Sequence, residues 1–245
     1  MNIGIIPARL ASKRFPKKIL ADLNGKPLVA HTIERAQKAK KLDRVLLAID
    51  SEETKSALEN YDFDIIMTSQ THSSGTDRIA EVMEEIHDAE IIINIQADEP
   101  LIDPYVIDSL VDSFEDESVR MSTVVSTKLT VSDLLNPNVV KAIIDEKKNA
   151  VEFKRNIFDV EIGGVYRHVG AYGFCRETLI QYSNLAPSDR ELRTSLEQLR
   201  ALDNNIPIRA VITDYASVSV DILDDLAKVL KIIENSEKNL IDEKT

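Results

Sequence analysis

The sequence is poor in the residues that mark several protein classes: its 245 residues include one cysteine and no tryptophan. A single cysteine, Cys175, excludes an intrachain disulfide framework and a zinc site built from several cysteines. No apolar run approaches the ~18 residues of a membrane span. Met1 leads directly into a short apolar segment, without the basic stretch that opens a signal peptide. We therefore expect a soluble, cytoplasmic protein without a membrane partner.

The sequence also lacks an excess of positive charge. It has 30 lysines and arginines against 42 acidic residues, a net charge of -12. Nucleic acids require clustered cations on the protein that binds them, so this balance argues against a nucleic-acid partner. Local clusters of Lys and Arg become more informative in such an acidic chain.

The first half of the chain alternates short apolar segments with helical patterns. The strand-like segments are 3–6, 44–49, 65–67 and 91–95, and the helical ones are 28–40, 51–59, 78–86 and 104–114. Alternation of this kind predicts an α/β fold with a parallel sheet that helices cover on both faces. A length of 245 residues is ordinary for one such domain.

The second half is less regular. We expect a β-hairpin from 139 to 154, further strands at 121–127, 168–174 and 208–212, and helices at 131–135, 177–183 and 190–202. Two glycines in segment 168–174 indicate a bulge or a close backbone approach. A last helix begins near Ile222, and the charged tail beyond Asn235 is expected to fray.

A cluster of cations follows the first strand. Five of the ten residues from Arg9 to Lys18 are Lys or Arg. Ligands of open α/β sheets bind beyond the carboxyl ends of the strands, so this loop is placed to bind an anion such as a triphosphate. It matches neither the Gly-rich Walker loop nor the dinucleotide fingerprint. The alternative is a solvated basic loop.

Two acids stand at the end of a later strand. The apolar run from Ile91 ends in Asp98-Glu99-Pro100. The acids either hold a divalent metal with a phosphorylated substrate or form a strand-ending turn. A loop from His72 to Arg78 precedes this strand, and Arg78 lies in the first turn of a helix, where the dipole disfavours a cation. That position hints at an anionic partner.

These features, together with a late acid at Asp221, fall at strand ends or in loops next to them. A sheet that binds at its carboxyl edge would gather them into one site. Cations for a triphosphate and acids for a metal favour nucleotidyl transfer. The chain has no Ser-His-Asp order and no histidine cluster of a transition-metal site.

Nine short motifs along the chain resemble those of the 3-deoxy-manno-octulosonate (Kdo) cytidylyltransferase family, over residues 3 to about 230. They are Ile6-Pro7-Ala8-Arg9, Arg14-Phe15-Pro16, Asn24-Gly25-Lys26-Pro27, Ser74-Gly75-Thr76-Asp77-Arg78, Gln96-Ala97-Asp98-Glu99-Pro100, Asn136-Pro137-Asn138-Val139-Val140-Lys141, Arg167-His168-Val169-Gly170-Ala171-Tyr172-Gly173, Leu196-Glu197-Gln198-Leu199-Arg200 and Val220-Asp221.

The resemblance implies a Rossmann-like nucleotidyltransferase fold, with a mostly parallel central sheet flanked by helices. It also implies a small β-rich dimerisation subdomain, inserted at about 130–205 of the single domain, and a homodimer. The implied reaction is Mg²⁺-dependent: a sugar hydroxyl attacks the α-phosphate of CTP and pyrophosphate leaves.

The resemblance also assigns roles to residues. Arg9, Arg14 and Lys18 would hold the triphosphate, Pro7, Ala8 and Ser74 would lie along the cytidine, and Asp98 and Asp221 would bind Mg²⁺. Arg9, Lys18, Asp98 and Asp221 are the expected catalytic residues. The sugar pocket would be lined by Arg78, Gln96, Arg155, His168, Tyr172, Glu197 and Gln198, with an arginine pairing with the sugar carboxylate.

Several positions depart from the family pattern. Lys17 and Ala97 replace glycines, Ile19 replaces a proline, and Thr194 replaces a glutamate. Ser217 and Ser219 stand in place of glycines before Asp221. The Ile-Pro-Trp expected after Arg155 is missing, and Asp159–Tyr166 is shortened. Most of these departures lie on the sugar side.

Three alternatives stay open at this point. The same reaction could use 8-amino-Kdo or another 2-keto-3-deoxy acid sugar. A nucleotidyltransferase for sugar phosphates is disfavoured because the Gly-rich start of that family is missing. A catalytically silent nucleotide-binding protein would show CTP and Mg²⁺ binding without pyrophosphate release.

Overall fold

The computed structural model describes residues 1–12, 14–158 and 164–242. Its strands are β1 (Asn2–Ala8), β2 (Asp22–Leu23), β3 (Lys26–Pro27), β4 (Arg44–Ile49), β5 (Asp64–Met67), β6 (Ile91–Asn94), β7 (Met121–Ser126), β8 (Lys141–Ile144), β9 (Asn149–Lys154), β10 (Val165–Cys175) and β11 (Ile208–Thr213). Its helices are α1 (Leu28–Ala36), α2 (Glu52–Ala57), α3 (Gly75–Glu85), α4 (Pro104–Asp112), α5 (Val131–Leu134), α6 (Arg176–Ser183), α7 (Asp189–Thr194), α8 (Leu199–Asp203) and α9 (Leu223–Asp242).

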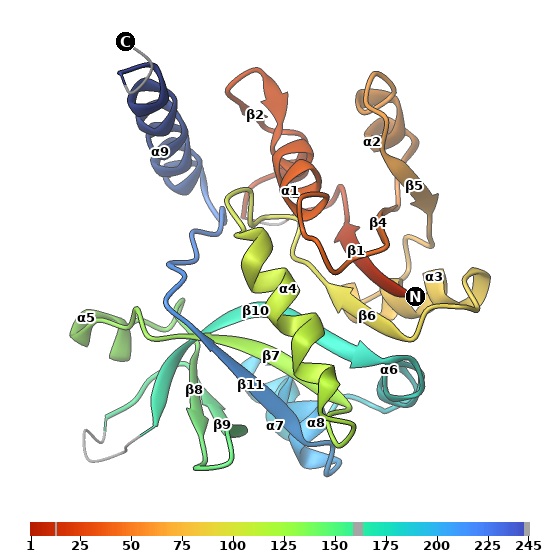
Figure 1. Cartoon of the computed structure of the whole chain (residues 1–245), viewed down its shortest axis with the longest axis vertical. Coiled ribbons are helices and arrows are strands. Elements are labelled where there is room, and N and C mark those ends of the chain that lie inside the picture. The colour runs from red at the N-terminus through yellow and green to blue at the C-terminus, as the bar shows by residue number, and fades with distance from the viewer. Residues whose placement is uncertain (13, 159–163, 243–245) are drawn as a thin grey trace.

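Among the described residues, nine strands form one mixed sheet in the order β5-β4-β1-β6-β10-β7-β11-β9-β8. Strands β5, β4, β1 and β6 are parallel neighbours, so the loops after them emerge at one edge (Figure 1). Beyond β6 the pairing changes, because β10 runs antiparallel to both β6 and β7. The expected α/β class is confirmed. The sheet, expected to be mostly parallel, is mixed, and its parallel strands lie mainly in the amino-terminal half.

The second half of the sheet closes on itself. The amino-terminal part of β10 also pairs with β8, so that β10, β7, β11, β9 and β8 form a ring. A register shift between Val169 and Tyr172 interrupts the β10–β7 ladder and lets β10 serve both halves. This is the irregularity expected from the two glycines of the strand. The β8–β9 hairpin is also as expected.

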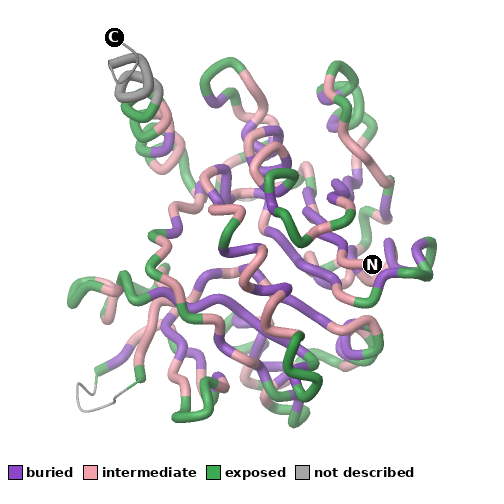
Figure 2. The backbone as a smooth tube through the Cα atoms, in the orientation of Figure 1, coloured by how far each residue is buried: buried purple, intermediate pink, exposed green. Residues whose placement is uncertain are grey.

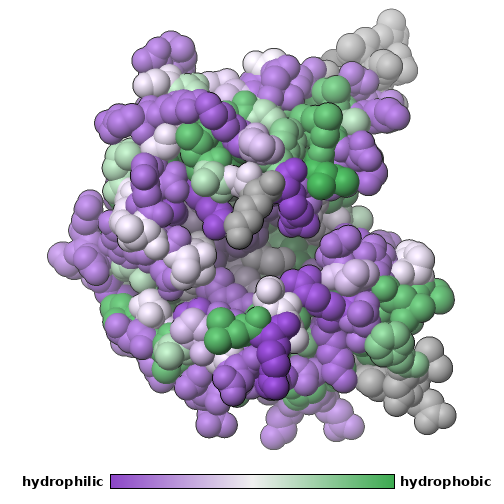
Figure 3. Space-filling model, turned by 180° about the vertical axis from the view of Figure 1, so that it is seen from behind, coloured by the Kyte–Doolittle hydropathy of each residue, from purple (hydrophilic) through white to green (hydrophobic). Residues whose placement is uncertain are grey.

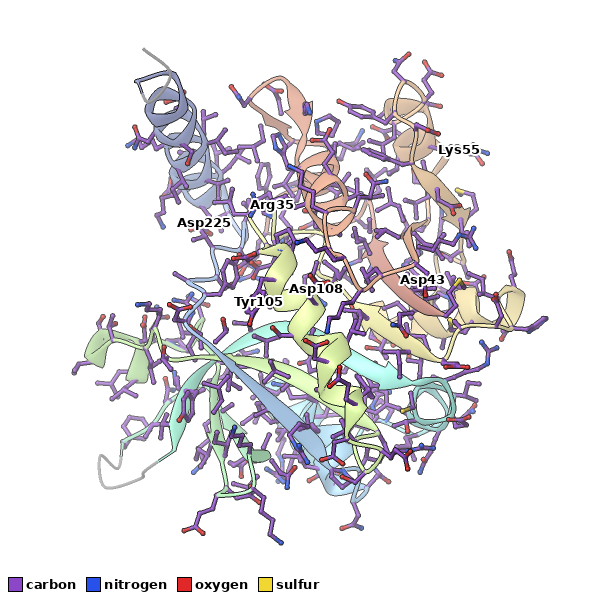
Figure 4. All side chains as sticks on the ribbon, viewed as in Figure 1. Arg35, Asp43, Lys55, Tyr105, Asp108 and Asp225 are labelled. Atoms are coloured by element: carbon purple, nitrogen blue, oxygen red, sulfur yellow. The ribbon has the colours of Figure 1, made fainter. Side chains whose placement is uncertain are left out.

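Helices cover both faces of the sheet, as the sequence predicts. Apolar residues of α1 and α4 pack on one face and those of α3, α6 and α8 on the other, each against strand residues that are almost all buried. Figure 2 shows the buried segments running through the strands in the middle of the molecule. Polar contacts also join the elements: Arg35 extends from α1 toward the start of α4 (Figure 4), where its Nε donates to the carbonyl of Ile102 at 2.5 Å.

Two helical predictions need correction. The expected helix 190–202 is broken at Ser195, which adopts a left-handed conformation with φ of 53°, so the chain forms α7 and α8 instead. The last helix continues to Asp242, past Asn235 where fraying was expected. Helix α9 packs on a separate apolar cluster that includes Leu23, Leu28 and Val220. None of the helices in the described ranges is long and apolar enough to cross a membrane.

Candidate active site

A cavity of about 720 Å³ lies at the carboxyl edge of β1 and β6. Seen from behind, the molecule is hollowed between an upper and a lower half, and hydrophilic residues border the hollow (Figure 3). The cavity is lined by Pro7, Arg9, Ala11, Ser12, Arg14, Lys18, Ile19, His72, Ser73, Ser74, Gly75, Arg78, Gln96, Ala97, Asp98, Ser195, Glu197 and Asp221. The cavity thus brings together the four features singled out in the sequence. They are the basic loop after the first strand, the loop from His72 to Arg78, Asp98 at the end of β6, and Asp221.

Two acids and two cations form the polar centre of this cavity. Lys18 Nζ lies 2.6 Å from Asp98 Oδ2 and 3.5 Å from Asp221 Oδ1, and Arg14 donates to Asp221 Oδ1 at 2.7 Å. Asp98 follows β6, and Asp221 ends the segment between β11 and α9. The amide of Val220 donates to the carbonyl of Asp98 at 2.9 Å, so the backbone itself joins the two segments.

The basic loop is shaped by an unusual backbone conformation just before Lys18. Lys17 has φ of 54°, the left-handed region that glycine enters without cost and other residues enter at roughly 1–2 kcal/mol. The loop then makes a short 3₁₀ turn, Lys18–Leu20. The lysine at position 17 therefore keeps the glycine-like geometry that directs Lys18 to the acids. Ala97 is accommodated in the cavity wall as well: the residue is 8% exposed, and the Thr32 hydroxyl donates to its carbonyl at 3.0 Å.

Helix α3 begins at the cavity with a reciprocal cap. The Ser74 hydroxyl accepts from the Asp77 amide, and the Asp77 carboxylate accepts from the Ser74 amide. Gly75 comes so close to Pro7 that a Cβ there would lie 3.1 Å from Pro7 Cγ. Pro7, Ser74 and Gly75 therefore form one wall. Ala8, expected along the same wall, is fully buried and does not line the cavity, because its side chain points into the core beneath β1.

The anionic partner of Arg78 lies within the chain itself. The Arg78 side chain is 3% exposed; its Nη2 donates to Asp50 Oδ2 at 3.0 Å and its Nη1 donates to the Thr68 hydroxyl. Asp50 also accepts from the amide of Leu10, at the start of the basic loop. Arg78 borders the cavity, but these partners occupy its guanidinium. These contacts give Arg78 a structural role, and its role toward the sugar stays a prediction.

The Arg155 side chain is also held by groups of the chain. Its guanidinium donates to three backbone carbonyls, those of Pro137, Thr194 and Ser195, at 2.8–2.9 Å. It does not line any of the described cavities. Arg155 holds the left-handed break at Ser195 in place, and Ser195 in turn lines the cavity.

A second buried cation organises the neighbouring turn. Lys141 is fully buried, and its Nζ donates to the carbonyls of Asp133, Asn136 and Val139 at 2.6–3.0 Å, and to that of Arg155. Burial lowers the pKa of this ammonium group. Four carbonyl oxygens around one ammonium fix the chain from 133 to 139.

The remaining sugar-side residues lie around two smaller spaces. Gln96 and His168 border a cavity of about 190 Å³ beside Asp98. His168 contacts the Thr123 hydroxyl at 3.0 Å and packs edge-on against Phe153, and its burial lowers its pKa to about 3. The imidazole is therefore neutral at pH 7 and can exchange hydrogen bonds without adding charge.

Tyr172, Glu197 and Gln198 border the third space. Glu197 Oε1 and Gln198 Nε2 are buried with no hydrogen-bond partner among the described residues. Burial raises the pKa of Glu197, while a hydrogen bond from Thr76 opposes the shift. Burial also raises the pKa of Tyr172. Buried polar atoms without partners are rare and often mark a ligand site.

Two residues that sequence reasoning did not assign also lie here. Arg167 borders the cavity of Gln96 and His168, and its side chain makes no hydrogen bond or ion pair to another described residue. Its charge acts on Glu99 and Asp133, whose pKa values it lowers. Its place in the Arg167–Gly173 motif was a signal that could have found it. Ser195 lines the large cavity only because the helix breaks there, and no local pattern announced this break.

The residue after Asp98 is a buried acid. Glu99 is 5% exposed and accepts from the Ser217 hydroxyl at 2.5 Å, and burial raises its pKa to about 7. It does not face the large cavity. This geometry fits the interpretation that Glu99 shapes the turn. Residues 159–163 of the shortened segment lie outside the described residues.

Comparisons with known proteins identify the family of this chain. The family model described as Cytidylyltransferase matches residues 3–209. The 3-deoxy-manno-octulosonate cytidylyltransferase of Geobacter metallireducens is 42% identical over 93% of this chain and 96% of its own length. The protein of that name from Chloroherpeton thalassium is 41% identical over 96% of this chain and 98% of its own length.

Solved structures agree. A CMP:2-keto-3-deoxy-manno-octonic acid synthetase in complex with CTP superposes with a TM-score of 0.90, at 32% identity, over 96% of this chain and all of that chain. The inositol-1-phosphate CTP transferase from T. maritima shares the fold, with a TM-score of 0.70 at 17% identity over 96% of this chain and 95% of its own. The chain belongs to the 3-deoxy-manno-octulosonate cytidylyltransferase family.

Proposed function

We propose that this protein transfers CMP from CTP to the anomeric hydroxyl of Kdo and releases pyrophosphate, a step of lipopolysaccharide biosynthesis. The observation that carries the proposal is the cluster of Lys18, Asp98 and Asp221 in a cavity large enough for a nucleotide. Relatives about 40% identical along nearly the whole chain, all named for this reaction, support the choice of substrates.

The cations of the basic loop bind the triphosphate. Arg9 is exposed at the cavity rim, Arg14 reaches inward to Asp221, and Lys18 lies deepest with 12% of its side chain exposed. Arginine grips phosphate oxygens in pairs and lysine acts as a point charge. Together they offset the charge that develops on the α- and β-phosphates as pyrophosphate leaves. The cytidine lies on the wall of Pro7, Ser74 and Gly75.

Asp98 and Asp221 suit a magnesium ion. Mg²⁺ takes few protein carboxylates and fills its shell with water and substrate oxygens, and these two acids face an open cavity beside the triphosphate site. The described residues contain no cluster of three or more metal-binding side chains, so a fully protein-bound ion does not fit here. When bound, the ion supplies charge neutralisation on the phosphates. Lys18 and Arg14 form ion pairs with the same acids.

The acid sugar occupies the space next to Asp98. Gln96 and His168 offer polar groups toward it, and Glu197, whose buried Oε1 has no hydrogen-bond partner among the described residues, lines the adjoining large cavity. Tyr172 and Gln198 border a separate space of about 10 Å³, which is too small for a sugar. Arg78 and Arg155 are occupied by groups of the chain. We therefore assign the sugar carboxylate to Arg167, the arginine of this region whose side chain makes no hydrogen bond or ion pair to another described residue.

We also propose a homodimer formed through the region of 130–205, and a cytoplasmic location, where CTP is made. Large apolar side chains at the surface of that region support the dimer: Val131, Leu135 and Phe158 are 85%, 61% and 83% exposed. Exposed apolar side chains gathered on one region are typical of a protein interface.

The test is a pyrophosphate-release assay with CTP, Mg²⁺ and a panel of Kdo, 8-amino-Kdo and sialic acid. We expect Kdo to give the highest kcat/KM. Turnover of Kdo no better than that of sialic acid would contradict the proposal, and faster turnover of 8-amino-Kdo would reassign the sugar. CTP binding without pyrophosphate release on any sugar would identify a silent nucleotide-binding protein.

The assignment of Arg167 has its own test. Arg167→Gln should raise the KM for the sugar at least about tenfold, because a charge-assisted pair contributes about 1.5–3 kcal/mol, and leave the KM for CTP unchanged. Arg120→Gln, which removes a surface arginine paired with Glu177, is the control. An unchanged sugar KM in the Arg167 variant would refute the assignment.

A further inference from the structure

Glu99 has no place in the reaction described so far, although it directly follows Asp98. Glu99 is 5% exposed and borders the smaller cavity of Gln96 and His168, not the large one. Oε1 accepts from the Ser217 hydroxyl at 2.5 Å, and Oε2 lies 3.5 Å from the Tyr215 hydroxyl. Ser217 is itself 8% exposed. A buried carboxylate costs free energy unless hydrogen bonds satisfy it, so this contact is a built feature of the fold.

The partners of Glu99 belong to the segment that carries Asp221. Residues 214–222 connect β11 to α9 without regular secondary structure, so no helix or strand ladder fixes the position of Asp221. Hydrogen bonds hold the segment instead. At its end, the Asp225 carboxylate in the first turn of α9 accepts from the Asp221 amide at 3.2 Å, and further contacts hold the residues before it. Ser217 bonds to Glu99, the Val220 amide donates to the Asp98 carbonyl at 2.9 Å, and the Ser126 hydroxyl donates to the Tyr215 carbonyl at 2.6 Å.

Two of these bonds end on consecutive residues of the turn after β6. The turn that presents Asp98 and the segment that presents Asp221 are thus tied to each other at Asp98 and Glu99. Each acid is more than a hundred residues from the other in the chain, and a magnesium ion between them tolerates only small errors in distance.

We propose that Glu99 is a positioning residue. Through its hydrogen bond to Ser217, it sets the separation of the Asp98 and Asp221 carboxylates and so prepares the magnesium site before CTP arrives. The proposal rests on the magnesium role given to these acids above. It predicts that the pair acts through the hydrogen bond and not through the charge of Glu99.

The experiment measures Mn²⁺ affinity of the CTP complex by electron paramagnetic resonance, beside hydrogen exchange of the Val220 amide. Ser217→Ala and Glu99→Ala should each weaken Mn²⁺ binding by about 10–100-fold, as loss of groups that support metal ligands does. The Val220 amide should exchange about tenfold faster, since its segment is released. Glu99→Gln keeps an oxygen acceptor for Ser217 and should stay within about threefold of the parent protein, a difference below ~0.7 kcal/mol.

A double variant and a matched control complete the design. Glu99→Ala combined with Ser217→Ala should weaken Mn²⁺ binding no more than either change alone, because both remove one interaction. Ser113→Ala removes a hydroxyl bond of 2.6 Å to the Leu110 carbonyl, away from the cavity, and should leave Mn²⁺ binding unchanged.

Three results would overturn the proposal, and Mn²⁺ binding by the parent protein distinguishes the third from the other two. If the parent binds Mn²⁺ and Ser217→Ala binds it equally well, or if Glu99→Gln loses as much as Glu99→Ala, the hydrogen bond does not position the acids. If the parent with CTP binds no Mn²⁺ at all, the magnesium role of Asp98 and Asp221 fails, and the positioning role fails with it.

Discussion

Lys18 and Lys141 are both withdrawn from water, yet they are held in opposite ways. Lys18, in the basic loop, contacts the carboxylates of Asp98 and Asp221 at the wall of an open cavity. Lys141, the first residue of β8, is enclosed by four backbone carbonyls. Carboxylates can pass from a lysine to a metal when a substrate binds, whereas backbone carbonyls are fixed by the fold. The partners of a buried cation therefore separate a cation that serves a ligand from one that serves the structure.

The same distinction covers the arginines. Arg14 pairs with an acid of the cavity, whereas Arg155 donates only to carbonyls and Arg78 to a buried acid of the scaffold. A sequence shows the cation but not its partner. The following variants test whether Lys18 serves a ligand and Lys141 serves the structure.

The largest effect is expected from removing the acids that Lys18 faces. Asp98→Asn and Asp221→Asn should each lower kcat by several orders of magnitude, because the phosphates lose the metal that neutralises them. Circular dichroism and the unfolding midpoint should stay close to those of the parent. Near-normal kcat at saturating Mg²⁺ would show that the substituted acid is not a metal ligand.

Lys18→Met should follow. We expect kcat to fall about 10²–10³-fold, the usual cost of losing one group that stabilises a developing charge. Stability should change little, since the side chain borders an open cavity. Steady-state kinetics and urea unfolding on the same preparation measure both. A large loss of stability would show that Lys18, like Lys141, serves the structure.

Lys141→Met is the mirror experiment. The variant should lose about 3 kcal/mol of unfolding free energy, because several buried carbonyls lose their donor. The kcat of the molecules that remain folded should stay within a few-fold of the parent. A normal stability with a lost kcat would mean that the carbonyl cage is not what Lys141 provides.

His168 extends the comparison to a buried base that stays neutral. Its neighbours are rings and one hydroxyl, and its pKa in the folded chain is about 3 against about 6.5 when unfolded. A lowered pKa contributes stability above pH 6.5, and that contribution is lost as the pH falls toward 3. Between pH 7.5 and 5 the parent should lose about 2 kcal/mol more than His168→Gln in urea unfolding. Parallel losses in the two proteins would argue against a neutral His168.

The nucleotide side of the fold could be predicted from local patterns. A buried parallel strand must end in a loop at the sheet edge, so the cations after β1 and the acids after β6 fall where the cavity lies. The break at Ser195 could not be predicted, because α7 and α8 both read as continuous helix. It depends on carbonyls that Arg155 gathers from a distant part of the chain.

The partners of the sugar-side arginines could not be predicted from the sequence for a related reason. Asp50 lies 28 residues before Arg78, and only the parallel pairing of β4 with β5 brings their surroundings together. Ala8 was misplaced because its neighbours Pro7 and Arg9 both line the cavity, while strand alternation turns its own side chain to the core.

The ring of β10, β7, β11, β9 and β8 also bears on the behaviour of this protein at high concentration. Because the ring closes, β5 is the one strand of the large sheet, as far as the described residues go, that has a neighbour on a single side. Open sheet edges invite pairing between molecules and hence aggregation. This edge is four residues long and begins with Asp64, which Arg44 holds at 2.5 Å, so it offers a poor template for a foreign strand.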